Sequence, residues 1–394
     1  MAVAGPLRLG MVGGGHGAFI GAVHRAAARL DGETLLACGA FSRDAENSRR
    51  TGAELQLDPA RCHADAAALF EAERNWSADA MEAVAIVTPN DSHVPLAMSA
   101  ANAGFHVISD KPAGVSLAEV ERLAETLEAT GAAYALTHTY LGYPMVWQAR
   151  HLAGREDFGP IRKVYIRYTQ GWLASQAEAA GSKQAEWRTD PARSGPAGAF
   201  GDIGTHAHSL AEFVADARMT RIAARLRSHF AGRGLDDDGE ASFEMDNGAS
   251  GLIVASQVCA GDENDLTLRV HGELAGLEWR QMEPNTLVER RADGTTRVHR
   301  AGVDMPLCAQ ALARCRLPSG HPEGYIEAFA NIYRAFARAI RDGVAPASRG
   351  VPGIAEALRG MAFVEAAVES AAAGGEWTEI TAPRKGPDLK GLLS

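Results

Sequence analysis

The segment LRLGMVGGGHGAF, residues 7–19, joins a short apolar run to a glycine-rich turn and then to an alanine-rich run of helical periodicity. Its spacing fits the pattern G-x-G-x-x-A. Glycines so spaced permit a tight turn and let backbone N–H groups approach a pyrophosphate at a helix N-terminus. The segment therefore predicts a strand, a nucleotide-binding turn and a helix. We expect the turn to present Gly13, Gly15, His16, Ala18 and Phe19 to a dinucleotide cofactor.

Apolar runs alternate with helical patterns through the first third of the chain. Further strands are expected at 34–41, 83–89, 106–110 and 132–138. Residues 116–131 read as an amphipathic helix that Ser116 caps and Gly131 ends. Because these strands are apolar without alternation, they predict a doubly wound parallel sheet covered on both faces.

The pattern changes after residue 138. Runs of alternating polar and apolar residues follow at 161–173, 221–230, 240–260, 265–279 and 285–301, with turn signals at Asn247-Gly248 and Asp293-Gly294. They predict a second α/β domain built on a large open, mostly antiparallel sheet. We therefore expect a parallel-sheet domain at 1–138, a second domain at 139–380 and a tail at 381–394.

Charge and cysteine usage exclude several classes of protein. The 394 residues carry a net charge of −10, which argues against a nucleic-acid or anionic-membrane partner. The five cysteines are scattered and show no metal-ligand spacing, so we expect reduced thiols and no metal site. The N-terminal residues lack the basic segment of a signal peptide, and the sequence favours a cytoplasmic protein.

The residues after the second strand bear on which dinucleotide binds. An acid at this place usually holds the adenosine ribose of NAD, whereas a nearby arginine accommodates the 2′-phosphate of NADP. Here Ser42 and Arg43 come first and Asp44 follows. The sequence leaves NAD and NADP open.

Two more strand ends carry polar residues. In a parallel sheet, ligands lie beyond the carboxyl ends of the strands. TPNDSH, residues 88–93, follows the third strand, and we expect it to contribute Thr88, Pro89, Asn90 and His93 to the cofactor groove. Asp110, Lys111 and Pro112 follow the fourth strand, where a cis Lys-Pro bond would direct the lysine.

A possible acid–base pair lies in the segment DIGTH, residues 202–206. Asp202 and His206 are four residues apart, so they share one face of a helix. A carboxylate beside an imidazole is suited to proton transfer near neutral pH. Alone, the pair is more typical of a helix cap followed by an ordinary histidine.

Together, GGGHGA, DKP and DIGTH resemble the motifs of the glucose–fructose oxidoreductase/inositol dehydrogenase (Gfo/Idh/MocA) family over nearly the whole chain. The resemblance implies a Rossmann domain followed by a domain with an open antiparallel sheet. It implies that Lys111 and His206 are catalytic and that Asp202 binds substrate, with Asn90 and His93 near the nicotinamide ribose. It departs at Asp110, where the family carries Glu.

The resemblance also points to a sugar-like substrate. Flat apolar sugar faces stack on aromatic rings, while hydroxyls need directional partners. Besides Lys111, Asp202 and His206, we expect the substrate to contact Tyr140, Trp187, Arg188, His321 and Tyr325, with His138 nearby. The acidic run LDDD, residues 235–238, favours a solvated loop or an interface over a cation site.

The function implied is hydride transfer between NAD or NADP and a secondary alcohol or ketone of a cyclic polyol, sugar or glycoside. One alternative is an NAD-dependent glycosidase that oxidises its sugar transiently, and another is a non-catalytic NAD(P)-sensing protein. Lys111 and His206 are both open as the general base. The resemblance further implies a homodimer or homotetramer formed through the second sheet.

Overall fold

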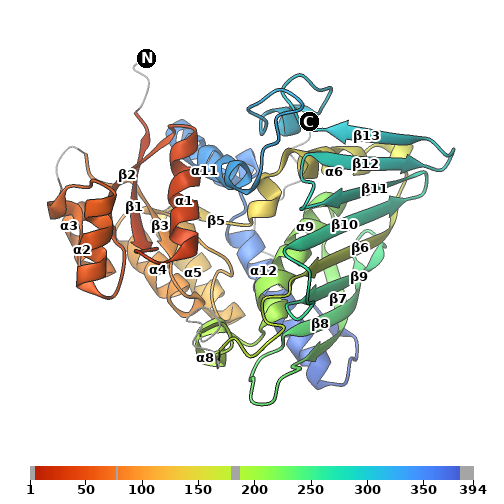
Figure 1. The fold of residues 1–394 in the computed structure, drawn as a ribbon, viewed down its shortest axis with the longest axis horizontal. Coiled ribbons are helices and arrows are strands. Elements are labelled where there is room, and N and C mark those ends of the chain that lie inside the picture. Colours follow the sequence, from red (N-terminus) through yellow and green to blue (C-terminus); the bar gives the residue numbers. More distant parts are fainter. Residues whose placement is uncertain (1–4, 77–78, 179–186, 382–394) are drawn as a thin grey trace. The chain divides into compact units, whose positions relative to one another are not determined.

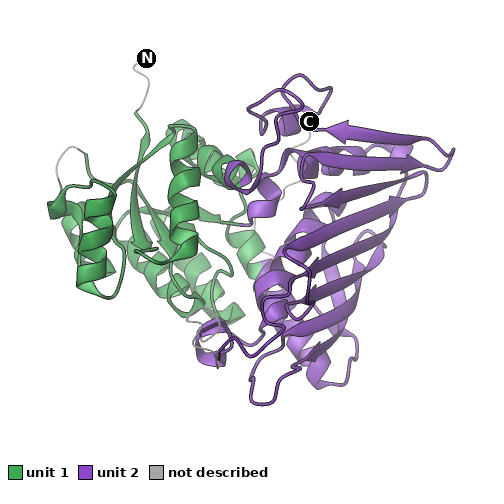
Figure 2. Ribbon diagram, viewed as in Figure 1, with its two compact units in different colours: residues 1–137, 329–358, 384–394 green, residues 138–328, 359–383 purple. Residues whose placement is uncertain are grey.

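The computed structural model describes residues 5–76, 79–178 and 187–381. The chain divides into two compact units, which Figure 2 colours separately. The described first unit comprises residues up to 137 and 329–358, and the second comprises 138–328 and residues from 359 onward. The expected tail from 381 lies outside the described residues, apart from its first residue. No helix in the described ranges is long and apolar enough to cross a bilayer.

The first unit is built on a five-stranded parallel sheet with the order β2-β1-β3-β4-β5. Its strands are β1 (Leu7–Gly13), β2 (Thr34–Ala40), β3 (Ala83–Val87), β4 (His106–Ser109) and β5 (Tyr134–Leu136). The connecting helices are α1 (Phe19–Leu30), α2 (Ala45–Glu54), α3 (Ala66–Arg74), α4 (His93–Asn102) and α5 (Leu117–Thr130), with 3-10 turns at Pro59–Arg61 and Asn90–Ser92. The predicted parallel sheet is confirmed. Because β2 lies on one side of β1 and β3 on the other, the strand order reverses between β1 and β3.

The expected caps of α5 are present. The Ser116 side chain accepts a hydrogen bond from the Glu119 N–H, and Gly131 ends the helix with φ +68°. A side chain at residue 131 would be strained in that left-handed conformation, which is why glycine ends the helix there.

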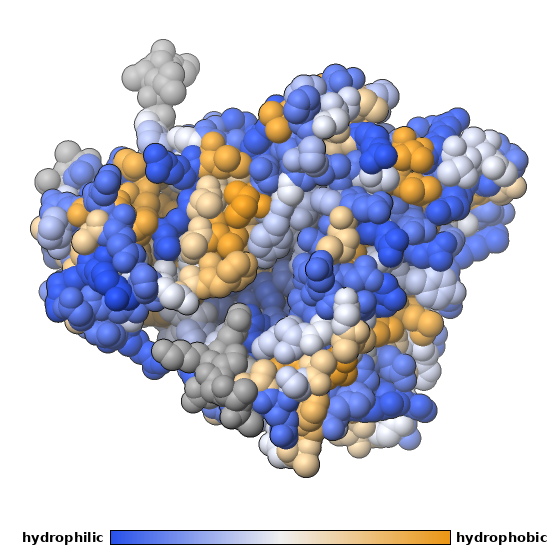
Figure 3. All heavy atoms as spheres, in the orientation of Figure 1, coloured by the Kyte–Doolittle hydropathy of each residue, from blue (hydrophilic) through white to orange (hydrophobic). Residues whose placement is uncertain are grey.

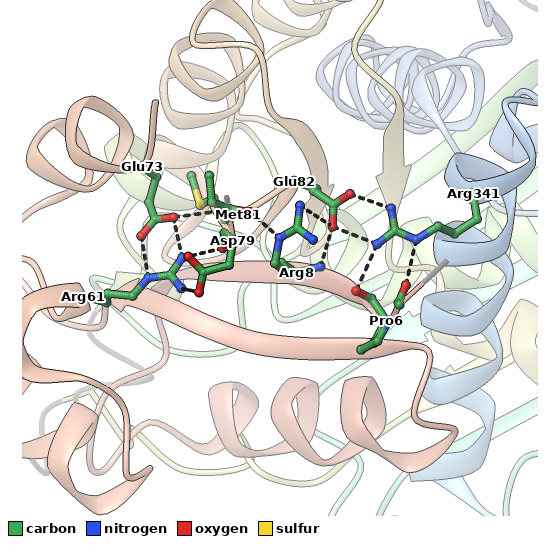
Figure 4. A network of polar contacts seen from close by, with 10 residues as sticks. Pro6, Arg8, Arg61, Glu73, Asp79, Met81, Glu82 and Arg341 are labelled. Atoms are coloured by element: carbon green, nitrogen blue, oxygen red, sulfur yellow. Dashed lines mark hydrogen bonds and ion pairs between the residues drawn. The ribbon is translucent and has the colours of Figure 1, made fainter. Parts of the chain in front are cut away.

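A segment from late in the chain also belongs to the first unit, against the prediction that 139–380 form one domain. Helix α11 (Tyr325–Asp342) places Tyr333 and Phe329 against His24 of α1. Its last turn carries Arg341, which forms an ion pair with Glu82 at the start of β3 (Figure 4). The sequence predicted a helix at 323–341, but it did not predict that this helix would contact the segment at the start of β3.

A second ion pair of the first unit is buried. The Arg61 Nη2 lies 2.6 Å from Glu73 Oε2, and their side chains are 7% and 0% exposed. Glu73 also accepts the Met81 N–H, and Arg61 lies within reach of Asp79 (Figure 4). These contacts join α3 to the segment that leads into β3.

The second unit is built on a nine-stranded sheet with the order β13-β12-β11-β10-β6-β9-β8-β7-β14. Its neighbours pair antiparallel except β6 and β9, which are parallel. The strands are β6 (Ile161–Thr169), β7 (Met219–Arg227), β8 (Asp238–Met245), β9 (Ser250–Ser256), β10 (Asp265–Gly272), β11 (Ala275–Arg280), β12 (Thr286–Arg291), β13 (Thr296–Arg300) and β14 (Thr378–Glu379). The mostly antiparallel sheet is as predicted, and the expected turns form with Gly248 and Gly294 at φ +85° and +86°.

Helices cover one face of this sheet (Figure 1). Helix α6 (Pro144–Ala153) contacts β11 and β12, and α9 (Thr205–Ala215) contacts β6, β9 and β10. The short elements of the unit are 3-10 turns at Thr139–Gly142 and Glu156–Phe158, α8 (Pro191–Ser194), η5 (Phe200–Gly204) and α10 (Ala309–Leu312). Helix α12 (Ile354–Ala372), after a 3-10 turn at Pro346–Arg349, begins in the first unit and continues into the second. On the other face, Tyr165 and Leu252 are 40% and 46% exposed.

Candidate active site

The glycine turn after β1 has the backbone that a pyrophosphate requires. Gly13, Gly14 and Gly17 have φ of +86°, +70° and +83°. A Cβ on Gly15 would lie 2.8 Å from the Phe41 carbonyl oxygen, so a side chain there would clash. The turn leads directly into α1, whose free N–H groups and dipole attract an anion. This geometry fits a dinucleotide.

The third small residue of the pattern is not the one that packs most closely. Ala18 is the N-cap of α1. A Cβ on Gly21 would lie 2.3 Å from the Gly14 Cα, so Gly21 permits the close approach of helix and turn that the fingerprint needs. Gly21 was not predicted from the sequence, although a lone glycine inside an alanine-rich helix is a signal of close packing.

Two other residues of the turn differ in their surroundings. His16 donates its backbone N–H to Thr51 Oγ1, and its ring nitrogen lies 3.2 Å from Glu54 Oε2 on α2. Phe19 is 72% exposed, and hydrophobic surface gathers over α1 in Figure 3. An exposed aromatic ring directly after the glycine turn offers apolar contact to a bound cofactor.

The residues after β2 arrange themselves around the start of α2. The Asp44 carboxylate accepts the Glu46 N–H and so caps the helix, while Ser42 Oγ accepts the Asp44 N–H. Arg43 is exposed. One carboxylate oxygen of Asp44 already accepts a hydrogen bond from α2. Asp44 is therefore less able to bind ribose hydroxyls than an acid placed at the end of β2 would be.

His93 joins the two loops that follow β3 and β4. It is 1% exposed, and its Nδ1 and Nε2 each lie 2.7 Å from a backbone carbonyl oxygen, of Pro112 and Thr88 respectively. This arrangement makes His93 a support for both loops, and its contact with a cofactor stays a prediction. Asn90 is also buried, at 6% exposed. The Lys111–Pro112 bond is cis, as predicted.

Asp110 organises the backbone around Lys111. Its Oδ1 accepts the Lys111 N–H and the Thr137 hydroxyl, each at 2.9 Å. Its Oδ2 lies 3.9 Å from His24 Nε2, and His24 Nδ1 lies 2.7 Å from the Tyr333 hydroxyl. A carboxylate of this length therefore reaches both its own loop and α1.

We expect His24 to make stability depend on pH. Burial lowers its pKa from 6.5 to about 4, although Asp110 opposes this shift. Between these values the unfolded chain binds a proton that the folded protein does not, so the free energy of unfolding falls as pH falls. From pH 7 to 4.5 this histidine alone accounts for about 2 kcal/mol. Glutamine does not titrate in this range. Between pH 7 and 4.5, the free energy of unfolding in urea should therefore fall by about 2 kcal/mol less in His24→Gln than in wild type.

The comparison must be made between variant and wild type because another group acts in the opposite direction. Burial raises the pKa of Asp236 to about 6, so its contribution increases as pH falls through the same range. Equal losses in wild type and His24→Gln would contradict the prediction.

In the second unit, His206 lies among aromatic rings. It is 7% exposed, and its ring centroid lies 5.6 Å from that of His138, 4.8 Å from Tyr140 and 6.2 Å from Tyr168. Burial raises the pKa of both tyrosines, so their hydroxyls stay protonated and neutral. The predicted residues His138, Tyr140 and His206 thus lie together, with the Tyr325 ring 6.4 Å from that of Tyr140.

Asp202 is held by two donors. Arg188 forms an ion pair with its Oδ2, and Gln257 donates from Nε2 to the same oxygen at 2.9 Å. The Arg188 guanidinium lies 4.8 Å from the centre of the Trp187 ring, so this predicted pair also lies at the site. Asp202 belongs to η5, a π-helical turn that precedes α9, which corrects the expectation of an unbroken α-helix. Such turns are rare and occur often at functional sites.

A chain of hydroxyl, indole and amide groups continues from Asp202. Gln257 also donates to Gln170 Oε1 at 3.2 Å, and Gln170 donates to Asn264 Oδ1 at 2.7 Å. Its members besides Asp202 are Tyr140, Tyr168, Gln170, Trp172, Gln257 and Asn264. Of these residues, Tyr140 was predicted from the sequence and the others were not. The run YTQGW at the end of β6 is the one local signal, since it places polar and aromatic residues at a strand end.

The remaining predicted residues behave differently. His321 is exposed, and its Nδ1 lies 3.3 Å from the Pro318 carbonyl oxygen. The run LDDD is no solvated loop, which corrects one of the two expected alternatives, while the interface stays a prediction. Asp237 is 0% exposed, and its Oδ2 lies 2.6 Å from Arg233 Nη1.

Both parts of the chain match family models. Residues 7–138 match the oxidoreductase family with an NAD-binding Rossmann fold, and residues 146–278 match the GFO/IDH/MocA C-terminal domain. The chain belongs to the Gfo/Idh/MocA family of oxidoreductases. This family member is therefore an NAD-binding oxidoreductase. That its glycine turn holds the cofactor's pyrophosphate stays a prediction.

Relatives of this Gfo/Idh/MocA protein include sugar and polyol dehydrogenases. An uncharacterized oxidoreductase, YfiI of Bacillus subtilis, is 32% identical over 96% of this chain and 98% of its own. An inositol dehydrogenase homolog from Azotobacter vinelandii, solved with NAD⁺, superposes with a TM-score of 0.91 at 35% identity, over 96% and 98% of the chains. The B. subtilis scyllo-inositol 2-dehydrogenase (NAD(+)) is 28% identical over 51% of this chain and 58% of its own.

Proposed function

We propose that this oxidoreductase transfers a hydride between NAD(P) and a secondary alcohol or ketone of a cyclic polyol or sugar. The observation that carries the proposal is the setting of DIGTH, where a buried imidazole and a hydrogen-bonded carboxylate adjoin a chain of hydroxyl and amide groups. Such groups suit a polyhydroxylated ring, because each hydroxyl needs a directional donor or acceptor. A structure of the A. vinelandii homolog with NADH and myo-inositol supports the same substrate class.

In this proposal each motif has one task. When bound, the nicotinamide supplies the hydride acceptor. His206 accepts the hydroxyl proton of the substrate, the role that histidine most often has in general acid–base catalysis. Lys111 donates a hydrogen bond to the same oxygen and stabilises its developing negative charge. Asp202 binds a neighbouring hydroxyl and orients the ring.

The charges of the second unit favour an uncharged substrate. The Arg188 cation is neutralised by its ion pair with Asp202. The groups that continue from Asp202 are amides, phenols and an indole, which carry no charge. An anionic ring would have no unneutralised cation in this chain of groups, so inositols and neutral sugars fit better.

A substrate screen tests the proposal. Inositols, neutral monosaccharides and glycosides would be supplied with NAD⁺ and NADP⁺ separately, and NADH or NADPH followed at 340 nm. We expect turnover of at least one cyclic polyol or neutral sugar. Release of an aglycone without net reduction of the cofactor would instead support the transient-oxidation glycosidase. Tight NADH binding with no turnover across the panel would count against both reactions.

Cofactor preference depends on Arg43 in our proposal. We expect Arg43→Glu to lower kcat/KM for NADP⁺ at least ~10-fold, the effect of one lost charge-assisted contact to a 2′-phosphate. The same change should alter kcat/KM for NAD⁺ by less than ~3-fold, because NAD lacks that phosphate. Arg50→Glu on exposed α2 is the matched control. Equal losses with both cofactors would refute this role.

We also propose that the protein is a homodimer or homotetramer through the uncovered face of its second sheet. Tyr165 and Leu252 are exposed there, and arginines of the same sheet form ion pairs with Glu278. Large exposed side chains on an open face favour cover by a second copy. Sedimentation velocity should show an oligomer that Leu252→Arg shifts toward monomer. A monomeric wild type would exclude it.

A further inference from the structure

The acidic turn that leads into β8 reaches the start of the π-helical turn that carries Asp202. The Asp236 carboxylate accepts the Gly198 N–H at 2.6 Å and the Phe200 N–H at 2.8 Å. The Asp236 carbonyl oxygen accepts the N–H of Ala199 between them, at 2.9 Å. Three successive donors are therefore bound by one residue 36 to 38 positions away.

These contacts complete the N-terminus of a helix from outside its own sequence. The first N–H groups of a helix lack intrahelical partners, and a local Ser, Thr, Asp or Asn usually supplies one. No side chain caps η5 in this way. A Cβ on Gly198 would lie 2.0 Å from the Asp236 carbonyl oxygen, so the approach of the two segments requires glycine.

Asp202 is connected to the same acidic turn by two routes. Along the backbone, the Asp202 N–H donates to the Gly198 carbonyl oxygen at 2.9 Å, and the Gly198 N–H is bound by Asp236. By the second route, the backbone N–H of Gln257 donates to the Asp237 carbonyl oxygen at 2.8 Å, and the Gln257 side chain donates from Nε2 to Asp202 Oδ2. Both the amide and the carboxylate of Asp202 thus depend on residues 236–237.

We infer that Asp236 is a positioning residue for Asp202, acting by fixing the π-helical turn from which the substrate-binding carboxylate projects. The inference rests on the proposed function. Burial raises the pKa of Asp236 to about 6, even though its backbone hydrogen bonds lower it. The ionised Asp236 carboxylate therefore lowers the free energy of unfolding at neutral pH. Residues of functional sites often reduce stability in this way.

A double-mutant cycle separates positioning from general stability. Asp236→Asn loses one of two acceptors while keeping the shape, and Asp238→Asn in the same acidic run is the control. We expect Asp236→Asn to lower kcat/KM for the polyol by ~10- to 100-fold, as a displaced contact group does. The Kd for NADH, read by fluorescence, should not change. In an Asp202→Asn background the further loss should be below ~3-fold, because the group that Asp236 positions is already gone.

A second measurement needs no substrate. Hydrogen exchange of the peptide that covers residues 197–206 should be faster in Asp236→Asn than in wild type or Asp238→Asn. If Asp236→Asn does not fold, Asp236→Ser, which keeps one side-chain acceptor, takes its place in the cycle and in the exchange measurement.

Each outcome decides a different point. Multiplicative losses in the cycle, or unchanged exchange of residues 198–200, would overturn the positioning role. A wild type that turns over no cyclic polyol or sugar would overturn the proposed function, and the exchange data would still decide whether Asp236 fixes the turn. Coupled losses with faster exchange support both.

Discussion

Lys111→Met and His206→Ala are each expected to lower kcat by ~10²- to 10⁴-fold, the range typical of lost acid–base or electrostatic catalysis. Methionine keeps the length of lysine but cannot donate a hydrogen bond to the substrate oxygen. Alanine removes the imidazole that accepts the proton. The Kd for NADH should stay within ~3-fold of wild type, because the glycine turn that binds the pyrophosphate is untouched.

Two controls separate catalysis from folding in this experiment. Lys163→Met removes a lysine whose Nζ lies 2.9 Å from Ser250 Oγ on the second sheet, and His271→Ala removes a half-buried histidine of β10. Both should retain nearly full kcat. The pH dependence of the residual rate shows whether Lys111 or His206 is the general base. The variant that lacks the general base should lose the acidic limb of the pH–rate profile. A near-normal rate in Lys111→Met or His206→Ala would remove that residue from the mechanism.

Arg61→Met is expected to destabilise the protein by about 3–5 kcal/mol, because it leaves the buried Glu73 carboxylate without its cation. Glu73 is fully buried, so water cannot replace the lost partner. The measurement is the free energy of unfolding in urea. The double variant Arg61→Met with Glu73→Gln should recover part of the loss, since no uncompensated charge remains.

The matched control is an exposed ion pair in the same unit. Arg49 and Glu46 lie 2.7 Å apart on α2 with side chains 64% and 77% exposed. Arg49→Met should therefore change the free energy of unfolding by less than about 1 kcal/mol. A loss of that small size for Arg61→Met would show that the buried pair relaxes or hydrates.

The sequence predicted the parts of the site that are local in the chain. Gly13 ends an apolar strand, and Gly15 and Lys111 each come two residues after one. The carboxyl ends of parallel strands meet at one edge. Their places could therefore be predicted from order alone. The parallel sheet, the antiparallel sheet and the hairpin glycines were predictable for the same reason, because period and turn chemistry are local signals.

The parts that the sequence did not predict depend on contacts between distant segments. Gln257 and Asn264 read as ordinary strand-end residues until the sheet places them beside Gln170. The acidic run that holds Asp236 predicted a solvated loop or an interface, yet backbone N–H groups at a remote helix start donate to the Asp236 carboxylate. The packing of α11 in the first unit was missed because an amphipathic stripe does not name its partner.

The parallel pairing of β6 with β9 determines which residues the second sheet can offer at one edge. Thr169 is level with Ser256, so Gln170 and Gln257 both follow the last pair and project from the same end of the sheet. Thr169 is also level with Asp265 of antiparallel β10, which brings the preceding Asn264 to that end. These three amides lie just beyond the named strands, so their side chains can change while the strand pairings are kept. In the proposed function, recognition of a new hydroxyl pattern can therefore arise by single substitutions on an unaltered scaffold.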